Sequence, residues 1–271
     1  MSKIIHPLSA ETEPSVPIPK GEVYLVGCGL GDVEQLTLKA YRIIREAEVV
    51  LYDHLISDEI LEVIPKTTQK IYVGKQKNAH SLSQEKINEL IAFYADQGKS
   101  VARLKSGDPY IFGRGSEEAL YLLQHGYKVD VIAGISSCVA GSACAGIPPT
   151  ARGYASSFSV VSAHLKDSKF NTDWLELLKI PNHTTVVLMG LSLAGRITEA
   201  ASAVGIPGDF PAAIVANASR PDQQSVVTTL DGLEKAAATI HGPAVIVFGE
   251  VVKLHGELPL YQAAKSVEAL R

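Results

Sequence analysis

Short apolar runs alternate with helical patterns through the first half of the chain, and this alternation constrains the fold most. The runs have the length of buried strands and span 22–27, 48–53, 70–74, 100–105 and 128–134. Between the first two runs, apolar residues recur at helical spacing at Leu38, Tyr41, Ile44 and Ala47. Because strands and helices follow one another in turn, we expect an α/β fold with a mainly parallel sheet and helices on both faces.

Local signals predict where two of these helices begin. Ser81 and Gln84 are spaced as a capping box, and Gly98 follows the last apolar position, so a helix is expected between them. Ser116 is expected to cap the next helix, which spans about 115–126.

The pattern breaks at 146–157, where two prolines and two glycines occur together. We therefore expect a flexible tail at 1–20, an N-terminal α/β domain at 21–150 and a C-terminal α/β domain at 151–271, with the active site in the cleft between the domains. Further strands are expected at 158–164, 184–190, 212–217, 224–230 and 243–251, with helical patterns near 173–180, 194–203 and 231–240. A short polar link between 217 and 224 favours a hairpin, which makes the second sheet mixed.

Composition excludes several classes of protein. The net charge of −4 disfavours a nucleic-acid binder. No apolar run approaches the ~20 residues of a membrane span, and the first residues lack the apolar core of a signal peptide, so we expect a cytoplasmic protein that does not bind membranes. The sequence has no metal-binding motif. The odd number of cysteines predicts buried free thiols at Cys28, Cys138 and Cys144.

The first glycine-rich loop, VGCGLGD at 26–32, only partly matches a dinucleotide motif. Gly27 and Gly29 fit G-x-G-x-x-G, but Asp32 takes the third glycine's position. A carboxylate there would repel a pyrophosphate at the helix N-terminus. The loop suits a nucleoside ligand without phosphates, such as S-adenosylmethionine, and equally a tight strand-to-helix turn.

Two further segments carry candidate ligand contacts. In the loop 103–118, Asp108 can accept hydrogen bonds from a ribose or an amine, and Arg114 can bind a carboxylate or pair with the acidic residues that follow it. In the small-residue segment 133–157, Ser136 and Ser137 suit a helix N-terminus, where they would either cap the helix or contact a ligand. Basic side chains gather in or beside these segments, at Arg103, Lys105, Arg114 and Arg152.

These motifs, in this order, resemble the uroporphyrinogen-III C-methyltransferases of the tetrapyrrole methylase family. The matching segments include VGCGLGDVEQLTLKA, VGKQKNAHSLSQEKIN, RLKSGDPYIFGRGSEE and GISSCVAGSACAGIPPTARGYASS, and the resemblance spans about residues 20–255. It implies a two-domain fold and a homodimer. It also implies transfer of methyl groups from S-adenosylmethionine to C2 and then C7 of uroporphyrinogen III, through precorrin-1 to precorrin-2, for sirohaem, cobalamin or haem d1 synthesis.

The resemblance also implies roles for individual residues. The cofactor contacts fall on Leu30, Ser106, Gly107, Asp108, Ile111, Ser136, Ser137, Met189, Ala218 and Ala244. Catalytic roles fall on Asp53, Lys75, Arg114 and His164, with Asp53 or His164 as proton acceptor. Substrate contacts fall on Arg114, Glu117, Arg152, His164 and Met189. The chain departs from the family pattern at Leu30, Ser106 and Ala218, where proline or glycine is usual, and none of these changes adds charge.

Other functions remain open on the sequence. A later corrin-pathway methyltransferase would share the fold, a nicotinamide-dependent oxidoreductase is disfavoured by Asp32, and a non-catalytic binding or assembly protein is a further alternative. Bifunctional relatives carry a dehydrogenase–chelatase module before the methylase. Only a short tail precedes Glu22 here, so we expect oxidation and iron insertion to occur on another protein.

Overall fold

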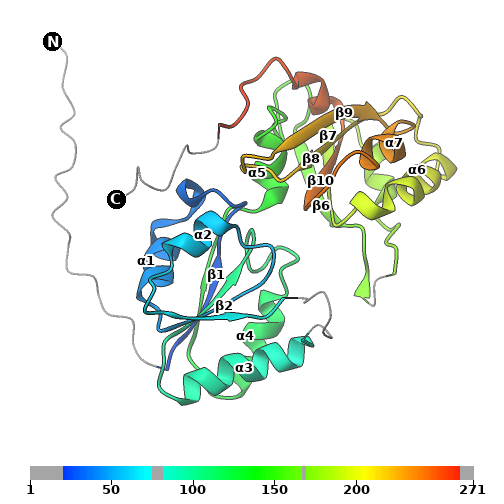
Figure 1. Cartoon of the computed structure of the whole chain (residues 1–271). Coiled ribbons are helices and arrows are strands. Elements are labelled where there is room, and N and C mark those ends of the chain that lie inside the picture. The colour runs from blue at the N-terminus through cyan, green and yellow to red at the C-terminus, as the bar shows by residue number, and fades with distance from the viewer. Residues whose placement is uncertain (1–20, 75–81, 167–168, 263–271) are drawn as a thin grey trace, which may run out of the picture.

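The computed structural model describes residues 21–74, 82–166 and 169–262, and these form two lobes (Figure 1). The predicted tail at 1–20, Ser81 and Lys75 lie outside the described residues. Within them, the first lobe holds a five-stranded sheet in the order β3-β2-β4-β1-β5, with every pairing parallel. Its strands are β1 (Val23–Gly27), β2 (Val49–Tyr52), β3 (Gln69–Tyr72), β4 (Val101–Lys105) and β5 (Val129–Ile132).

Helices cover both faces of this sheet, as the sequence predicts. Buried residues of α1 (Leu38–Glu46) and α2 (Asp58–Val63) pack on one face, and those of α3 (Gln84–Asp96) and α4 (Gly115–Gln124) pack on the other. The helix predicted from the apolar spacing is confirmed by α1, whose buried residues are Ala40, Ile43 and Ile44. One local expectation was wrong. Ser83, not Ser81, caps α3, with its Oγ accepting a hydrogen bond from the Lys86 amide at 3.3 Å.

The second lobe holds a mixed sheet. Among the described residues it has five strands in the order β6-β7-β10-β8-β9. The predicted hairpin is confirmed, because β8 and β9 pair antiparallel. The strands are β6 (Ser157–Ser162), β7 (His183–Leu188), β8 (Pro211–Ala216), β9 (Gln224–Thr229) and β10 (Ala244–Phe248).

Alternate residues of the central strand β10 point into two separate cores. Ile246 and Phe248 pack beneath α6 (Ala194–Ala203), α7 (Leu233–Ala237) and the 3₁₀ helix η3 (Leu175–Lys179). Val245 and Val247 pack on the opposite face, beneath α5 (Ser137–Ala143) and the 3₁₀ helix η5 (Glu250–Leu254). The sheet therefore separates two apolar layers.

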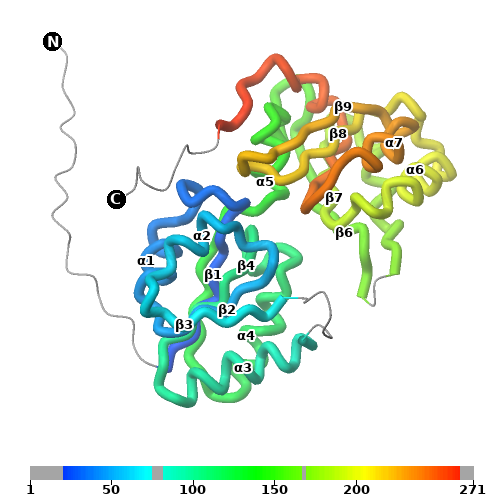
Figure 2. The backbone as a smooth tube through the Cα atoms, viewed as in Figure 1, coloured from blue at the N-terminus to red at the C-terminus, as the bar shows by residue number. Residues whose placement is uncertain are grey.

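Helix α5 links the lobes. It follows β5 of the first sheet but packs against β7, β8 and β10 of the second, and Figure 2 shows it beside the second sheet. The chain thus passes from the first sheet to the second lobe between Ile132 and Ser137, and the domain boundary at 150 stays a prediction. The three cysteines are buried and free, as expected. No helix of the described ranges combines the length and apolar character needed to cross a bilayer.

Candidate active site

Loops that follow β1, β4 and β5 pack together through bare backbone at the carboxyl edge of the first sheet. The Gly107 amide donates to the Gly29 carbonyl at 2.7 Å, which joins the two glycine-rich loops. A Cβ added at Gly27 would lie 2.5 Å from the Gly134 nitrogen, so the contact requires glycine. These glycines therefore bring the three loops to one place, where parallel sheets bind their ligands.

A cavity of about 440 Å³ lies between this edge and the strand ends of the second sheet. Its volume is within the range of small-molecule sites. Every predicted cofactor-binding residue except Asp108 lines it, namely Leu30, Ser106, Gly107, Ile111, Ser136, Ser137, Met189, Ala218 and Ala244. The two lobes thus contribute the two sides of one cavity.

Asp108 and Ser136 support the loops that form the cavity. The Asp108 carboxylate accepts hydrogen bonds from the amides of Tyr110 at 2.8 Å and Gly134 at 3.1 Å, which fixes its loop against β5. Ser136 is the N-cap of α5, and its Oγ accepts from the Cys138 amide at 3.4 Å. Ser136 therefore caps the helix, one of the two roles that the sequence allowed, and it also lines the cavity.

Strained backbone surrounds the same cavity. Positive φ angles of 49–58° occur at four of its non-glycine residues: Phe112, Arg114, Met189 and Asn217. Such conformations cost on the order of 1–3 kcal/mol each and persist where the surrounding structure enforces them. These residues occur in both lobes, so each lobe holds some of the cavity-lining loops in an unfavourable backbone conformation.

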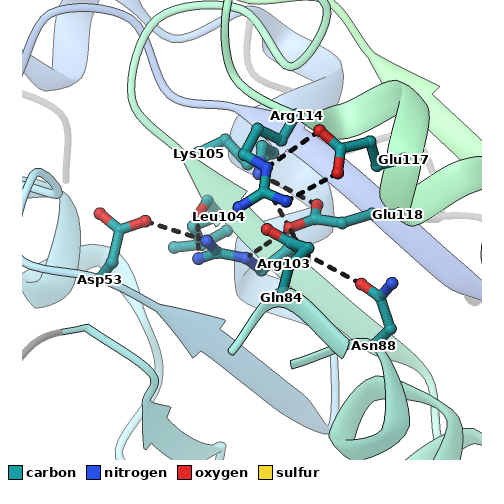
Figure 3. A network of polar contacts seen from close by, with 9 residues as sticks. All are labelled: Asp53, Gln84, Asn88, Arg103, Leu104, Lys105, Arg114, Glu117 and Glu118. Atoms are coloured by element: carbon teal, nitrogen blue, oxygen red, sulfur yellow. Dashed lines mark hydrogen bonds and ion pairs between the residues drawn. The ribbon is translucent and has the colours of Figure 1, made fainter. Parts of the chain in front are cut away.

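A buried polar cluster lies beside the cavity (Figure 3). Arg103 and Lys105 are alternate residues of β4, so both point to the face covered by α3 and α4. Glu118, in the first turn of α4, is fully buried and accepts from Lys105 Nζ at 3.0 Å with both carboxylate oxygens. Gln84 donates to the same carboxylate at 3.0 Å. Burial lowers the pKa of Lys105, and the neighbouring Glu118 carboxylate opposes this shift.

Arg103, Lys105 and Asp53 of this cluster line the cavity, and Asp53 does so from the loop after β2. Its Oδ2 accepts from the Arg103 guanidinium at 2.9 Å, and its Oδ1 accepts from the Leu55 amide at 3.0 Å. The second bond is a turn cap, so Asp53 fixes the loop after β2 and also lines the cavity. The partner predicted for it, Lys75, lies outside the described residues.

Arg114 also lines the cavity, but its guanidinium is paired with a carboxylate of its own helix. It binds Glu117 through two hydrogen bonds of 2.7 and 2.9 Å. The hydrogen bond from Arg114 lowers the pKa of Glu117. The predicted capping role of Ser116 was wrong, because α4 begins at Gly115 after a left-handed Arg114, with no side-chain cap. Ser116 is thus one residue too late to cap the helix.

The remaining predicted substrate contacts lie outside the cavity wall. Arg152 is exposed in a turn closed by the Ala151 and Ala155 backbone. His164 is half-buried after β6, and its backbone bonds to the Ser162 hydroxyl. Among the described residues, no group of three or more metal-ligating side chains occurs.

The sequence matches the family described as Tetrapyrrole (Corrin/Porphyrin) Methylases over residues 22–234. The chain belongs to this family. A siroheme synthase of Nitrosospira multiformis is 44% identical over 257 residues, which cover 94% of this chain and 54% of that protein. A siroheme synthase of Acinetobacter baylyi is 46% identical, over 89% of this chain and 53% of that protein. The chain therefore spans about half the length of these curated relatives.

Solved structures of methylases share the two-lobed fold. The uroporphyrin-III C-methyl transferase of Thermus thermophilus, complexed with S-adenyl homocysteine, matches with a TM-score of 0.75 and 39% identity, covering 86% of this chain and 99% of that one. A cobalt precorrin-4 methyltransferase matches with the same TM-score at 23% identity, which shows the fold alone. This chain is thus an enzyme of the tetrapyrrole methyltransferase family.

Two features of this methylase site were not predicted from the sequence. Arg220, from the loop after β8, donates to the carbonyls of Leu30 at 3.1 Å and Leu55 at 2.7 Å in the other lobe. Asp32 is buried, caps the 3₁₀ helix η1 (Val33–Gln35) and accepts from the Tyr261 hydroxyl at 2.8 Å. Asp32 is therefore part of the contact between the lobes and does not line the cavity.

Proposed function

We propose that this chain transfers methyl groups from S-adenosylmethionine to C2 and C7 of uroporphyrinogen III, through precorrin-1 to precorrin-2. The observation that carries the proposal is the cavity between the lobes, which is lined by Asp53, by Arg114 and by nearly all the residues expected to contact the donor. The name and the bound S-adenyl homocysteine of the Thermus thermophilus neighbour support the same donor and acceptor. Precorrin-2 would serve sirohaem, cobalamin or haem d1 synthesis.

The cavity wall suits this donor. Its glycine backbone and small side chains, such as Gly107, Ala218 and Ala244, allow close approach of a nucleoside, and Ile111 and Met189 add apolar surface. The departures at Leu30, Ser106 and Ala218 line the cavity without adding charge. When bound, the donor's sulfonium supplies an electrophilic methyl group, and the residues of the chain contribute mainly alignment.

Cationic side chains suit the eight carboxylates of the acceptor, and Arg114 is one that lines the cavity. Arg114 is half-exposed at the cavity and already holds the Glu117 carboxylate in bidentate geometry, so a substrate carboxylate can take that place. Arg152 is exposed and is the second proposed anchor. Lys75 is proposed as a charged partner of the acid–base group.

Attack by a pyrrole carbon leaves positive charge on the ring, which is relieved when an N–H proton departs. Asp53 is the proposed acceptor, because it lines the cavity and is held by Arg103 and the Leu55 amide. His164 is the other candidate. Its position outside the cavity wall favours Asp53.

The test is anaerobic incubation of the protein with uroporphyrinogen III and S-adenosylmethionine, followed by mass measurement of the products. We expect the mass of two added methyl groups, and no added methyl would refute the proposal. S-adenosylhomocysteine should raise the melting temperature and NAD should not.

Arg114→Leu should lose most turnover while retaining S-adenosylhomocysteine binding. The matched control is Arg45→Leu, since Arg45 is exposed on α1 and, within the described part of the chain, contacts Tyr41 of its own helix. Full activity in Arg114→Leu would remove Arg114 from the substrate site.

A further inference from the structure

The buried cluster beside the cavity holds two cations and two carboxylates (Figure 3). Arg103, Lys105 and Glu118 have side-chain exposures of 5%, 6% and 0%. Asp53 is more exposed, at 22%, and lines the cavity, whereas Glu118 does not. One carboxylate thus faces the site and the other lies behind it.

Arg103 lies between the two carboxylates and contacts them unequally. Its Nη2 lies 2.9 Å from Asp53 Oδ2, whereas its Nε lies 3.5 Å from Glu118 Oε1. A third nitrogen, Nη1, donates to the Leu104 carbonyl at 2.8 Å. The guanidinium is therefore directed mainly toward Asp53.

Lys105 explains why Glu118 does not draw Arg103 closer. Both Glu118 oxygens accept from Lys105 Nζ at 3.0 Å, and Gln84 supplies a further donor to Oε1. A fully buried carboxylate needs charged partners, and leaving one unpaired is strongly unfavourable. Without the ammonium, Arg103 is the remaining described cation that forms an ion pair with Glu118, at 3.5 Å, while the charge of the exposed Arg114 acts on Glu118 without an ion pair among the described contacts.

The charged groups around the cluster fit this arrangement, in which Arg103 binds Asp53 and Lys105 binds Glu118. Asp53 is bound by Arg103 of β4 and also lies near Lys105 and the Cys28 thiol. Two residues further along the chain from Asp53, the Leu55 carbonyl accepts a hydrogen bond from the Arg220 guanidinium. Lys105 faces Glu118, Arg103 and Asp53, and its charge also acts on Glu117. Burial lowers the pKa of Lys105, and the Glu118 carboxylate counteracts this shift.

We propose that Lys105 is a positioning residue for the proton acceptor: by holding both oxygens of Glu118, it leaves the Arg103 guanidinium on Asp53. The inference rests on the proposed methylation and adds two residues to it. Lys105 and Arg103 both line the cavity, whereas Glu118 does not, and in this proposal Lys105 acts on Asp53 through Glu118 and Arg103.

The kinetic test is the pH dependence of kcat/KM for uroporphyrinogen III at saturating S-adenosylmethionine. In Lys105→Met, Glu118 should draw Arg103 away from Asp53. Because a close cation favours the charged form of a carboxyl group, its loss should move the acid limb to higher pH. Lys105→Met combined with Glu118→Gln removes the competing carboxylate, so the acid limb should return toward the native position.

Lys39→Met is the matched control, because Lys39 makes an exposed ion pair with Asp130 on the same lobe. Its acid limb should stay in place. If Lys105→Met does not fold, Lys105→Gln tests the same shift, since an amide keeps a donor for Glu118 but removes the charge. An unshifted acid limb in the folded Lys105 variant, or a double variant no closer to native than the single one, would overturn the inference.

A structural readout separates this inference from the proposed function. In a crystal structure of ligand-free Lys105→Met, the Arg103 guanidinium should lie closer to Glu118 than to Asp53. An unchanged Arg103 would refute the inference even in an active enzyme. Absence of methylation by the native protein would refute the proposed function, and the Arg103 position would still decide the role of Lys105.

Discussion

Arg220 is the most informative residue to perturb, because its side chain joins the lobes at the cavity. Its guanidinium donates to the Leu30 and Leu55 carbonyls at 3.1 and 2.7 Å. A hydrogen bond from a charged donor contributes about 1.5–3 kcal/mol when buried. Arg220 is half-buried, so we expect Arg220→Met to lower the free energy of unfolding by about 2 kcal/mol for the two bonds together.

The assay is thermal unfolding with and without S-adenosylhomocysteine. A loss of about 2 kcal/mol predicts a Tm lower by about 4–8 °C for a chain of this size. Because Leu30 lines the cavity, ligand affinity should also fall by about tenfold, or about 1.4 kcal/mol. Arg196→Met is the control, since Arg196 is exposed and stacks over Phe170 within the second lobe. A native Tm and a native Kd in Arg220→Met would refute this role.

Three further perturbations test packing and protonation. Gly134→Ala should lower stability by about 1–3 kcal/mol in urea unfolding, because its Cβ would lie 2.2 Å from the Gly107 carbonyl; a native midpoint would contradict the close packing. Burial raises the pKa of Cys28 to about 12, so its thiol should resist alkylation at pH 8 until the protein unfolds. Burial lowers the pKa of His183, so the unfolded state binds more protons and stability should fall as pH drops below about 6.5. His183→Gln should lose that part of the pH dependence in urea titrations.

The parallel sheet was predictable because each strand is an apolar run with its own turn signal. The capping of α3 was not, because both Ser81 and Ser83 precede the helix and the sequence pattern alone does not decide which of the two hydroxyls accepts from the free amides. Sequence spacing gives the period of α1, while packing on the sheet makes Ile43 rather than Tyr41 a fully buried position.

The site was predictable to different degrees. Two charged residues within a buried strand, Arg103 and Lys105, indicate that partners must exist, since buried charges are seldom left unpaired. Their partner is Glu118 and not Glu117 because the register of α4 turns only Glu118 inward. No sequence pattern indicates the role of Arg220, because its hydrogen-bond partners are backbone carbonyls 190 and 165 residues away in the sequence.

The strained residues suggest why the site needs two lobes. Phe112 and Arg114 have positive φ in a loop of the first lobe, and Met189 and Asn217 have positive φ directly after β7 and β8. Each such conformation costs on the order of 1–3 kcal/mol, so it must be enforced by rigid neighbours. Those neighbours are the two sheets, whose strand ends meet at the cavity. Each lobe can therefore fix its own part of the wall, and contacts such as those of Arg220 need only set how the two parts face each other.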